Sequence, residues 1–269
     1  MNIYIDKSNW EIYKKSSPFP FAEINNFIIP EVYKKIKLNF PDLNDFEEDG
    51  DISANNIQIR KSFYKFSKYK NLFWYEFGNQ FVNEDFFYNY CDFFKDDINH
   101  FYPKIYKKLK DRNLNIGVSG LDDPKNFDIL LDFQIGINTP VIKKKSVRGP
   151  HIDNYKELYA GLCYLKDSDD YTDSGHFIVF KKRPFIFNKI GKGRSFDQSN
   201  LIEIKKIKYS SNKLSTFLNT KKSIHGVSER EITSKVRKFF VFNSVITNEN
   251  LINFSLLKKL KKNLLKYIS

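Results

Sequence analysis

Apolar and polar residues alternate along positions 127–138, and no other feature of the chain restricts its fold as strongly. Because residues two apart point to the same face of a β-strand, the pattern predicts a strand with one apolar face and one largely polar face. The polar face either lines an internal site or lies in solvent. Its residues include Asp132, Gln134 and Asn138.

Further short segments rich in β-branched and aromatic residues follow this strand, separated by turn-forming runs such as residues 167–170. Many short strands in succession are typical of a barrel or a sandwich, so the sequence predicts a mainly β class. The additional strand candidates are residues 158–165, 176–181, 201–208, 214–219 and 236–243.

Helical patterns flank the strand-rich region. Residues 30–36 start with a proline, which suits the first helical position, and Pro41 closes the helix. Between residues 69 and 109 apolar residues recur every three or four positions, which predicts two amphipathic helices packed on the sheet. The basic segment 250–269 predicts a further amphipathic helix, whose leucine stripe packs on the protein body or lies on an anionic membrane.

The length of 269 residues suits one domain spanning 1–269, and 41% hydrophobic and 17% aromatic residues supply a core and exclude a disordered chain. Cys91 and Cys163 are expected to be small core residues, which indicates a reducing compartment. The first ten residues lack the apolar stretch of a signal peptide, and no segment approaches the roughly 18 apolar residues of a membrane span. We therefore expect a cytoplasmic protein without a transmembrane segment.

The formal net charge of +13 would attract anionic partners such as nucleic acid, an acidic glycan or a membrane surface. The excess charge is mostly lysine scattered along the chain, which favours general solvation over a dedicated polyanion site. The sequence contains no motif for reading DNA or RNA bases, and it gives no indication of oligomeric state.

A candidate metal site begins at His151 and Asp153, which lie two apart and would reach the same cation from one face of a strand. Two imidazoles and one carboxylate on one face of an octahedron are the ligands of non-haem iron(II). Of the remaining histidines, His225 is the best third ligand because it follows an extended segment. His176 and His100 are expected to be structural or exposed.

A candidate anion site follows on the segment 236–243, where Arg237 shares a face with apolar neighbours. A buried arginine requires an anion, and its planar fork suits a carboxylate. Arg230 competes for this role, but it lies in a loop with two glutamates that could pair with it on the surface, so we prefer Arg237.

Together these motifs, with the intervening Tyr164-Leu165 and Gly175-His176-Phe177 segments, resemble the iron(II)/2-oxoglutarate-dependent oxygenases, in particular members similar to prolyl 4-hydroxylases. The Pro-Phe-Pro-Phe opening at 18–21 also matches the way many members begin. The resemblance implies a double-stranded β-helix core (jelly-roll or cupin-like) over about 125–245, braced by a strand and helices within about 1–120.

The resemblance also implies the reaction. Iron(II) would be held by the catalytic residues His151, Asp153 and His225, and 2-oxoglutarate by Arg237 and Tyr164, although Tyr164 could equally be a core aromatic. Dioxygen would then drive hydroxylation of an unactivated carbon with release of succinate and CO₂. Halogenating relatives lack the carboxylate, so Asp153 favours hydroxylation, although desaturation or ring closure would follow from the same chemistry.

The substrate stays open between a small molecule, a sugar or glycan, and a protein side chain. Weaker candidates for contacting it are Gln134, Asn138 and Arg148, and the last of these ends a basic loop that also suits simple solvation. Two rival functions are a non-catalytic or differently metallated cupin-like binding protein and a nucleic-acid-modifying module.

Overall fold

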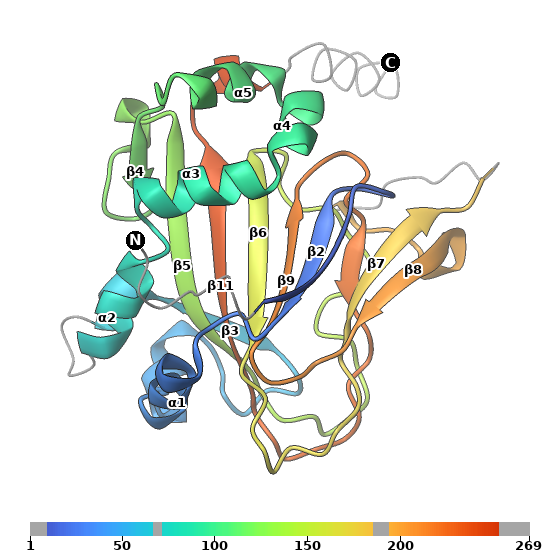
Figure 1. Ribbon diagram of the computed structural model, residues 1–269. Coiled ribbons are helices and arrows are strands. Elements are labelled where there is room, and N and C mark those ends of the chain that lie inside the picture. Colours follow the sequence, from blue (N-terminus) through green and yellow to red (C-terminus); the bar gives the residue numbers. More distant parts are fainter. Residues whose placement is uncertain (1–9, 67–71, 185–193, 253–269) are drawn as a thin grey trace, which may run out of the picture.

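The computed structural model describes residues 10–66, 72–184 and 194–252, and it confirms a mainly β fold with flanking helices (Figure 1). One large sheet has eight strands and a small sheet has three. In sheet order the large sheet contains β1 (Glu11–Lys15), β2 (Phe21–Asn25), β9 (Lys213–Leu218), β6 (Glu157–Tyr164), β11 (Arg237–Ile246), β5 (Ile129–Asn138) and β3 (Gln58–Ser62), with β4 (Ile116–Val118) parallel to β5. The small sheet contains β10 (His225–Val227), β7 (Phe177–Lys182) and β8 (Leu201–Ile207).

Helices cover one side of the large sheet, with α3, α4 and α5 grouped at one end and α1 and α2 at the other (Figure 1). Short 3₁₀ turns connect several of these elements. The helices are α1 (Pro30–Leu38), α2 (Leu72–Asn79), α3 (Glu84–Phe93), α4 (Lys95–Phe101) and α5 (Pro103–Lys110), and the 3₁₀ turns are Leu43–Asp49, Phe63–Phe66, Pro124–Asn126, Gln198–Asn200 and Glu249–Leu251.

The alternation in β5 divides the large sheet into two faces. Phe133 and Ile135 on the outer face join the cluster that packs against the helices. On the inner face, Phe239 and Val241 of β11 pack with Val179 of β7, so the two sheets face each other across a second apolar cluster. This two-sheet packing is the jelly-roll arrangement expected for a double-stranded β-helix.

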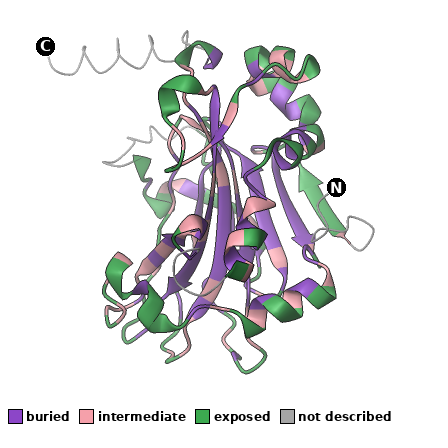
Figure 2. Ribbon diagram, turned by 90° about the vertical axis from the view of Figure 1, so that its left-hand side faces the viewer, coloured by how far each residue is buried: buried purple, intermediate pink, exposed green. Residues whose placement is uncertain are grey.

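Burial follows the same division. In Figure 2 the central strands are buried along most of their length, and exposed residues collect on the helices, the loops and the edge strand β1. None of the helices within the described ranges is long and apolar enough to cross a membrane.

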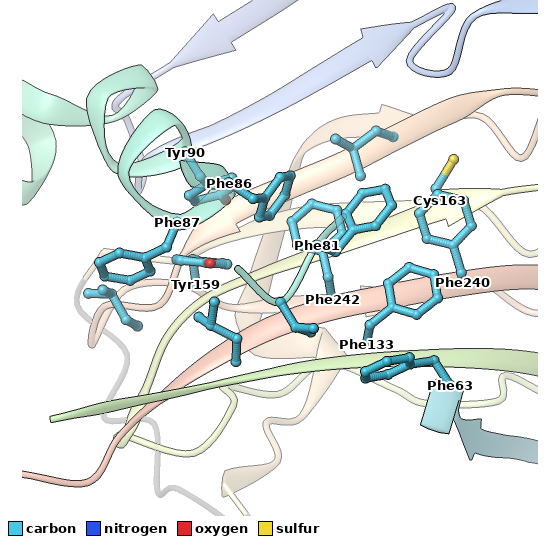
Figure 3. Packing of buried hydrophobic residues seen from close by; sticks show 14 of the residues in the cluster. Phe63, Phe81, Phe86, Phe87, Tyr90, Phe133, Tyr159, Cys163, Phe240 and Phe242 are labelled. Atoms are coloured by element: carbon cyan, nitrogen blue, oxygen red, sulfur yellow. The ribbon is translucent and has the colours of Figure 1, made fainter. Parts of the chain in front are cut away.

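An aromatic cluster fixes the helices on the outer face (Figure 3). Phe81 lies at its centre, with ring centroids 4.9 Å from Phe133, 5.0 Å from Phe86 and 5.4 Å from Phe242. Tyr90 of α3 stacks on Tyr159 of β6 at 3.9 Å. Because aromatic rings bury large apolar areas, these contacts join the helical layer to the sheet.

Most predicted strands are present. The segment 127–138 corresponds to β5, and the five shorter candidates correspond to β6, β7, β8, β9 and β11. Four strands escaped prediction: all residues of β1 are exposed, β3 alternates over only five residues, and β4 and β10 have three residues each. The helix predicted over 250–269 lies, beyond Ile252, outside the described residues.

The prediction of two helices over 69–109 was wrong, because the structure contains four, α2 to α5. Asn83 starts α3, since its side chain accepts a hydrogen bond from the Phe86 backbone N–H. Pro103 lacks an N–H and therefore starts α5 instead of continuing α4. The helix predicted from Pro30 is α1, which ends at Leu38 before Pro41.

Replacing Phe81 with alanine should lower the free energy of unfolding by about 3–5 kcal/mol, because the cavity would remove contacts to both the helices and the sheet. Ile142→Ala is the control, since Ile142 is 71% exposed and its truncation should change stability by less than about 0.5 kcal/mol. Urea unfolding of both variants measures this difference, and equal losses would contradict the central role of Phe81.

Candidate metal centre

Two chain segments that are distant in sequence meet at the candidate metal ligands. The His151 N–H donates to the His225 carbonyl at 2.8 Å, and the His225 N–H donates to the His151 carbonyl at 3.0 Å. His225 begins β10, whereas His151 forms only isolated bridges, so the expectation of a regular strand at 151–153 was wrong. On one side the register shifts, because the Val227 N–H donates to the Arg148 carbonyl at 2.9 Å and not to Gly149, and on the other side a turn from Asn154 to Glu157 follows.

The three predicted ligand side chains converge. The Nε2 atom of His151 lies 3.3 Å from Oδ1 of Asp153, and the Nε2 atom of His225 lies 3.4 Å from Oδ2. One donor atom from each residue lies within 4.8 Å of the others, a separation that allows all three to bind one cation.

Backbone carbonyls fix the tautomer of both imidazoles. Nδ1 of His151 lies 2.8 Å from the Gly149 carbonyl, and Nδ1 of His225 lies 2.9 Å from the Ser223 carbonyl. A carbonyl oxygen only accepts, so each Nδ1 carries the hydrogen and donates it. Each Nε2 is therefore the nitrogen left to bind a metal, on the side of the ring that faces Asp153.

The charge state also suits a metal. Burial lowers the pKa of His225 to about 4, so this ring is neutral at neutral pH. Burial acts to raise the pKa of Asp153, but His225, His151 and Arg148 outweigh it and hold the pKa below its usual range. Arg148 is part of the rim, with Nη2 3.7 Å from Oδ1 of Asp153.

Packing restricts the ring of His225. Phe177 stacks on it with centroids 5.4 Å apart, and Phe217 lies 4.4 Å away. A Cβ atom on Gly226 would lie only 3.0 Å from backbone atoms of Gly149 and Pro150. Glycine at 226 therefore permits the close approach of the two histidine segments.

Arg237 occupies the inner face with 1% of its surface exposed. Its guanidinium lies 4.8 Å from the ring centroid of Tyr164 and 4.0 Å from that of Tyr209, and Nη2 donates to the Gly175 carbonyl. Its Nε and the Tyr164 hydroxyl are buried and have no hydrogen-bond partner in the described part of the chain. No carboxylate of the described residues pairs with Arg237 either.

Arg230 is also buried, so the expectation that glutamates pair with it on the surface was wrong. Its guanidinium donates to the Asn56 side chain at 2.7 Å and to the carbonyls of Thr139 and Lys235 at 2.9 and 3.1 Å. Burial and the neighbouring charge of Arg237 lower the pKa of Arg230 to about 10. These neutral acceptors give Arg230 a bracing role between loops.

The weaker candidates for substrate contact on β5, Gln134 and Asn138, lie at different points along the strand. Gln134 donates to Asp132 at 2.9 Å, and Asn138 lies directly opposite Arg237 in the β5–β11 register.

The other two histidines are not placed as metal ligands. The Nδ1 atom of His176 accepts from the Tyr209 backbone N–H at 3.2 Å. His100 is exposed beside Phe101.

Sequence reasoning missed three polar residues of the inner face: Tyr209, Arg60 and Glu157. Tyr209 follows β8 in a loop without periodicity, and Arg60 lies on a strand of only five residues. The signal that could have found Arg60 is the short alternation of Gln58, Arg60 and Ser62 around buried Ile59.

Comparison with known proteins gives likeness of structure only. No protein-family model matches the chain, and no curated protein matches it. A prolyl hydroxylase from Trichoplax adhaerens, solved with a peptide of the hypoxia-inducible factor oxygen degradation domain, has 13% identity and a TM-score of 0.39, covering 85% of this chain and 84% of its own. A prolyl-4-hydroxylase from Pseudomonas putida has 9% identity and a TM-score of 0.37, covering 84% and 92%.

We expect Gly226→Ala to weaken binding of a divalent metal by at least about tenfold, because the added methyl group forces the two histidine segments apart. Gly149→Ala is a matched control from the same contact, since a Cβ there meets no atom within 4 Å. Calorimetric titration with Mn²⁺ compares the two variants, and equal affinities would show that this close approach is not needed.

Proposed function

We propose that the protein is an iron(II)- and 2-oxoglutarate-dependent dioxygenase that hydroxylates an unactivated carbon. The observation that carries this proposal is the presence, in one β-sandwich, of a buried two-histidine, one-carboxylate cluster and a buried arginine, Arg237, without a carboxylate partner in the described chain. The first suits a transition metal with open positions, and the second requires an anion.

Iron(II) fits the ligand chemistry of His151, Asp153 and His225. Two neutral imidazoles and one carboxylate occupy one face of an octahedron and leave the other positions for exchangeable ligands. The carbonyls of Gly149 and Ser223 hold the imidazoles in the metal-binding tautomer, which lowers the cost of ordering them when the metal binds.

2-Oxoglutarate fits the unpaired polar groups at Arg237. Its distal carboxylate would accept hydrogen bonds from the guanidinium, including Nε, and from the Tyr164 hydroxyl, both of which are buried. Asn138 is 2% exposed and bonds only weakly to the Ile137 carbonyl at 3.4 Å, so we assign it to this end of the site rather than to the substrate.

When bound, iron and 2-oxoglutarate supply the oxidative chemistry: 2-oxoglutarate, O₂ and R–H become succinate, CO₂ and R–OH. The chain orients the participants and limits water. Phe177 and Phe217 shield His225, and Tyr164 and Tyr209 enclose Arg237. The metal position and the carboxylate position therefore both lie in surroundings of low polarity, where electrostatic interactions are strong.

A cytoplasmic location remains part of the proposal.

His225→Ala should abolish the weak visible absorption band that forms when 2-oxoglutarate chelates iron(II) in wild-type protein under anaerobic conditions. The physical reason is loss of one of three ligands that position the metal. His176→Ala is the control, because its ring contacts the Asp173 carbonyl and carboxylate and the Tyr209 backbone N–H but none of the three ligands, so the band should persist. A wild-type protein loaded with iron that gives no band would favour the non-catalytic, cupin-like alternative.

Arg237→Ala should raise the 2-oxoglutarate concentration needed for half-formation of that band by about 10²-fold, the cost of about 2–3 kcal/mol for a lost charge-assisted hydrogen bond. Arg230→Ala should raise it far less, although it should lower the unfolding temperature because three hydrogen bonds disappear. Equal effects of the two variants on the titration would refute the assignment of Arg237.

A further inference from the structure

A group of charged residues lies on the inner face of the large sheet, outside the metal ligands and the Arg237 region. Arg60 of β3 lies opposite Gly136 of β5. Asp132 lies opposite Asn243 in the β5–β11 register, and Glu157 lies opposite Val245 in the β6–β11 register. Since these positions share a face with Arg237, Arg60, Asp132, Glu157 and Asn243 form one polar patch, named here the charged cluster.

The charged cluster lies close to the metal ligands. Arg60 is within electrostatic range of Asp153 and Arg148 as well as of both cluster carboxylates. Glu157 is within range of Asp153, since the pKa of Glu157 is raised first by burial and then by the charge of Asp153. A molecule held by the charged cluster would therefore lie within electrostatic range of the metal ligands.

The charges of the cluster are near one another but not paired. The Arg60 guanidinium donates to Gln58 at 2.8 Å, and its Nε is buried with no partner among the described residues. The Asn243 side-chain oxygen is buried and also lacks one. Within the described residues, Asp132 accepts from Gln134 at 2.9 Å and from the Phe133 backbone, and Glu157 accepts from the Asn154 backbone N–H at 3.4 Å.

Such under-bonded charges lower the stability of the folded state unless a ligand binds to them. Burial raises the pKa of Asp132 to about 6 and that of Glu157 to about 7, because both carboxylates lose water without gaining enough donors. A half-buried guanidinium and two under-bonded carboxylates gain free energy when complementary charged groups reach them. A ligand that complements the whole cluster therefore carries both a negative group for Arg60 and a positive group for the two carboxylates.

We propose that the charged cluster binds the polar end of the substrate, and that this substrate is a small zwitterion of the free α-amino acid type. Arg60 receives the carboxylate. Asp132 and Glu157 accept hydrogen bonds from the ammonium group, whose three donors match two carboxylates and the Asn243 oxygen. The side chain of the amino acid then extends toward the metal. This inference rests on the proposed oxygenase function and defines its substrate class.

Other substrate classes fit the charged cluster less well. A neutral sugar or glycan has no charge for either Arg60 or the carboxylates, and a nucleic acid would be repelled by Asp132 and Glu157. A residue within a polypeptide has neither a free carboxylate nor a free ammonium on its backbone. Only a ligand with both groups satisfies the two signs of charge together.

The first test measures succinate release by wild-type protein with iron(II), 2-oxoglutarate and O₂ in the presence of each free L-amino acid in turn. We expect at least one to stimulate turnover, and its N-acetyl and its C-amide derivatives to lose at least about tenfold in kcat/KM. Equal activity of the capped derivatives would overturn the proposal. So would a protein that forms the 2-oxoglutarate chelate but responds to no free amino acid, an outcome that leaves the oxygenase function standing.

Variants separate recognition from structural support. Arg60→Met should lower kcat/KM for the free amino acid at least about tenfold but should change that for the C-amide little, since the amide has no carboxylate to lose. Arg60→Lys should recover part of the loss. The double variant Asp132→Asn, Glu157→Gln should likewise lower kcat/KM for the free amino acid, but should change that for the N-acetyl derivative little, since this derivative has no ammonium group. Equal losses for free and capped substrates would mean that these residues act only through the fold.

Two controls and a second readout complete the design. Arg183→Met and Glu203→Gln change exposed residues of the same types. The Arg183 side chain donates to the Ser199 carbonyl and Glu203 pairs with Lys206, far from any proposed role, so both variants should behave as wild type. Saturation-transfer NMR on the metal-free protein follows binding of the amino acid independently of turnover. Binding that survives Arg60→Met unchanged would contradict the role given to Arg60 even if the iron chemistry failed.

Discussion

The structure depends on the separation of the two faces of the large sheet, which follows from the alternation in β5 and β11. Outward-pointing residues such as Phe133 and Phe242 pack under the helices, so the sheet gains its stabilisation on that side. The inner face can then carry Arg237 and the charged cluster without leaving the sheet unsupported. A one-residue shift in register would exchange the faces, placing arginine in the aromatic core. The same periodicity therefore specifies both the core and the positions available for chemistry.

The metal ligands depend on a different interaction, the mutual backbone hydrogen bonds between His151 and His225. These bonds connect the small sheet, through β10, to the loop that carries His151 and Asp153. Gly226 permits the approach, and the Gly149 carbonyl, which lies at the same contact, also orients the His151 ring. Ligand geometry is thus built largely from backbone groups, which are less mobile than long side chains and hold their positions before a metal arrives.

Sequence predicted the parts of this protein whose signal is periodic or local. Alternation located β5 and placed Arg237 on one face of β11, and the proline at position 30 located the start of α1. It could not predict that Arg230 is buried, because the acceptors that make burial tolerable belong to Asn56 and Thr139, far away in the chain. It also could not place Arg60, since a five-residue edge strand carries too little periodic signal to show which residues face inward.

Buried charges in this fold are of two kinds, and the difference between them indicates which serve structure. Glu23 is paired at 2.6 Å with Lys213 and at 2.9 Å with Lys205, so its charge is neutralised within the protein and joins the large sheet to β8. Arg237 and Arg230 lie close together, and no carboxylate of the described residues forms an ion pair with either, so the charge of Asp170 acts on Arg230 only without direct contact and positive charge is in excess there. An anion that binds there stabilises the native state by about 2.7 kcal/mol at 100 times its dissociation constant. The folded protein is therefore less stable without that anion than with it, which is the expected consequence of a preformed binding site.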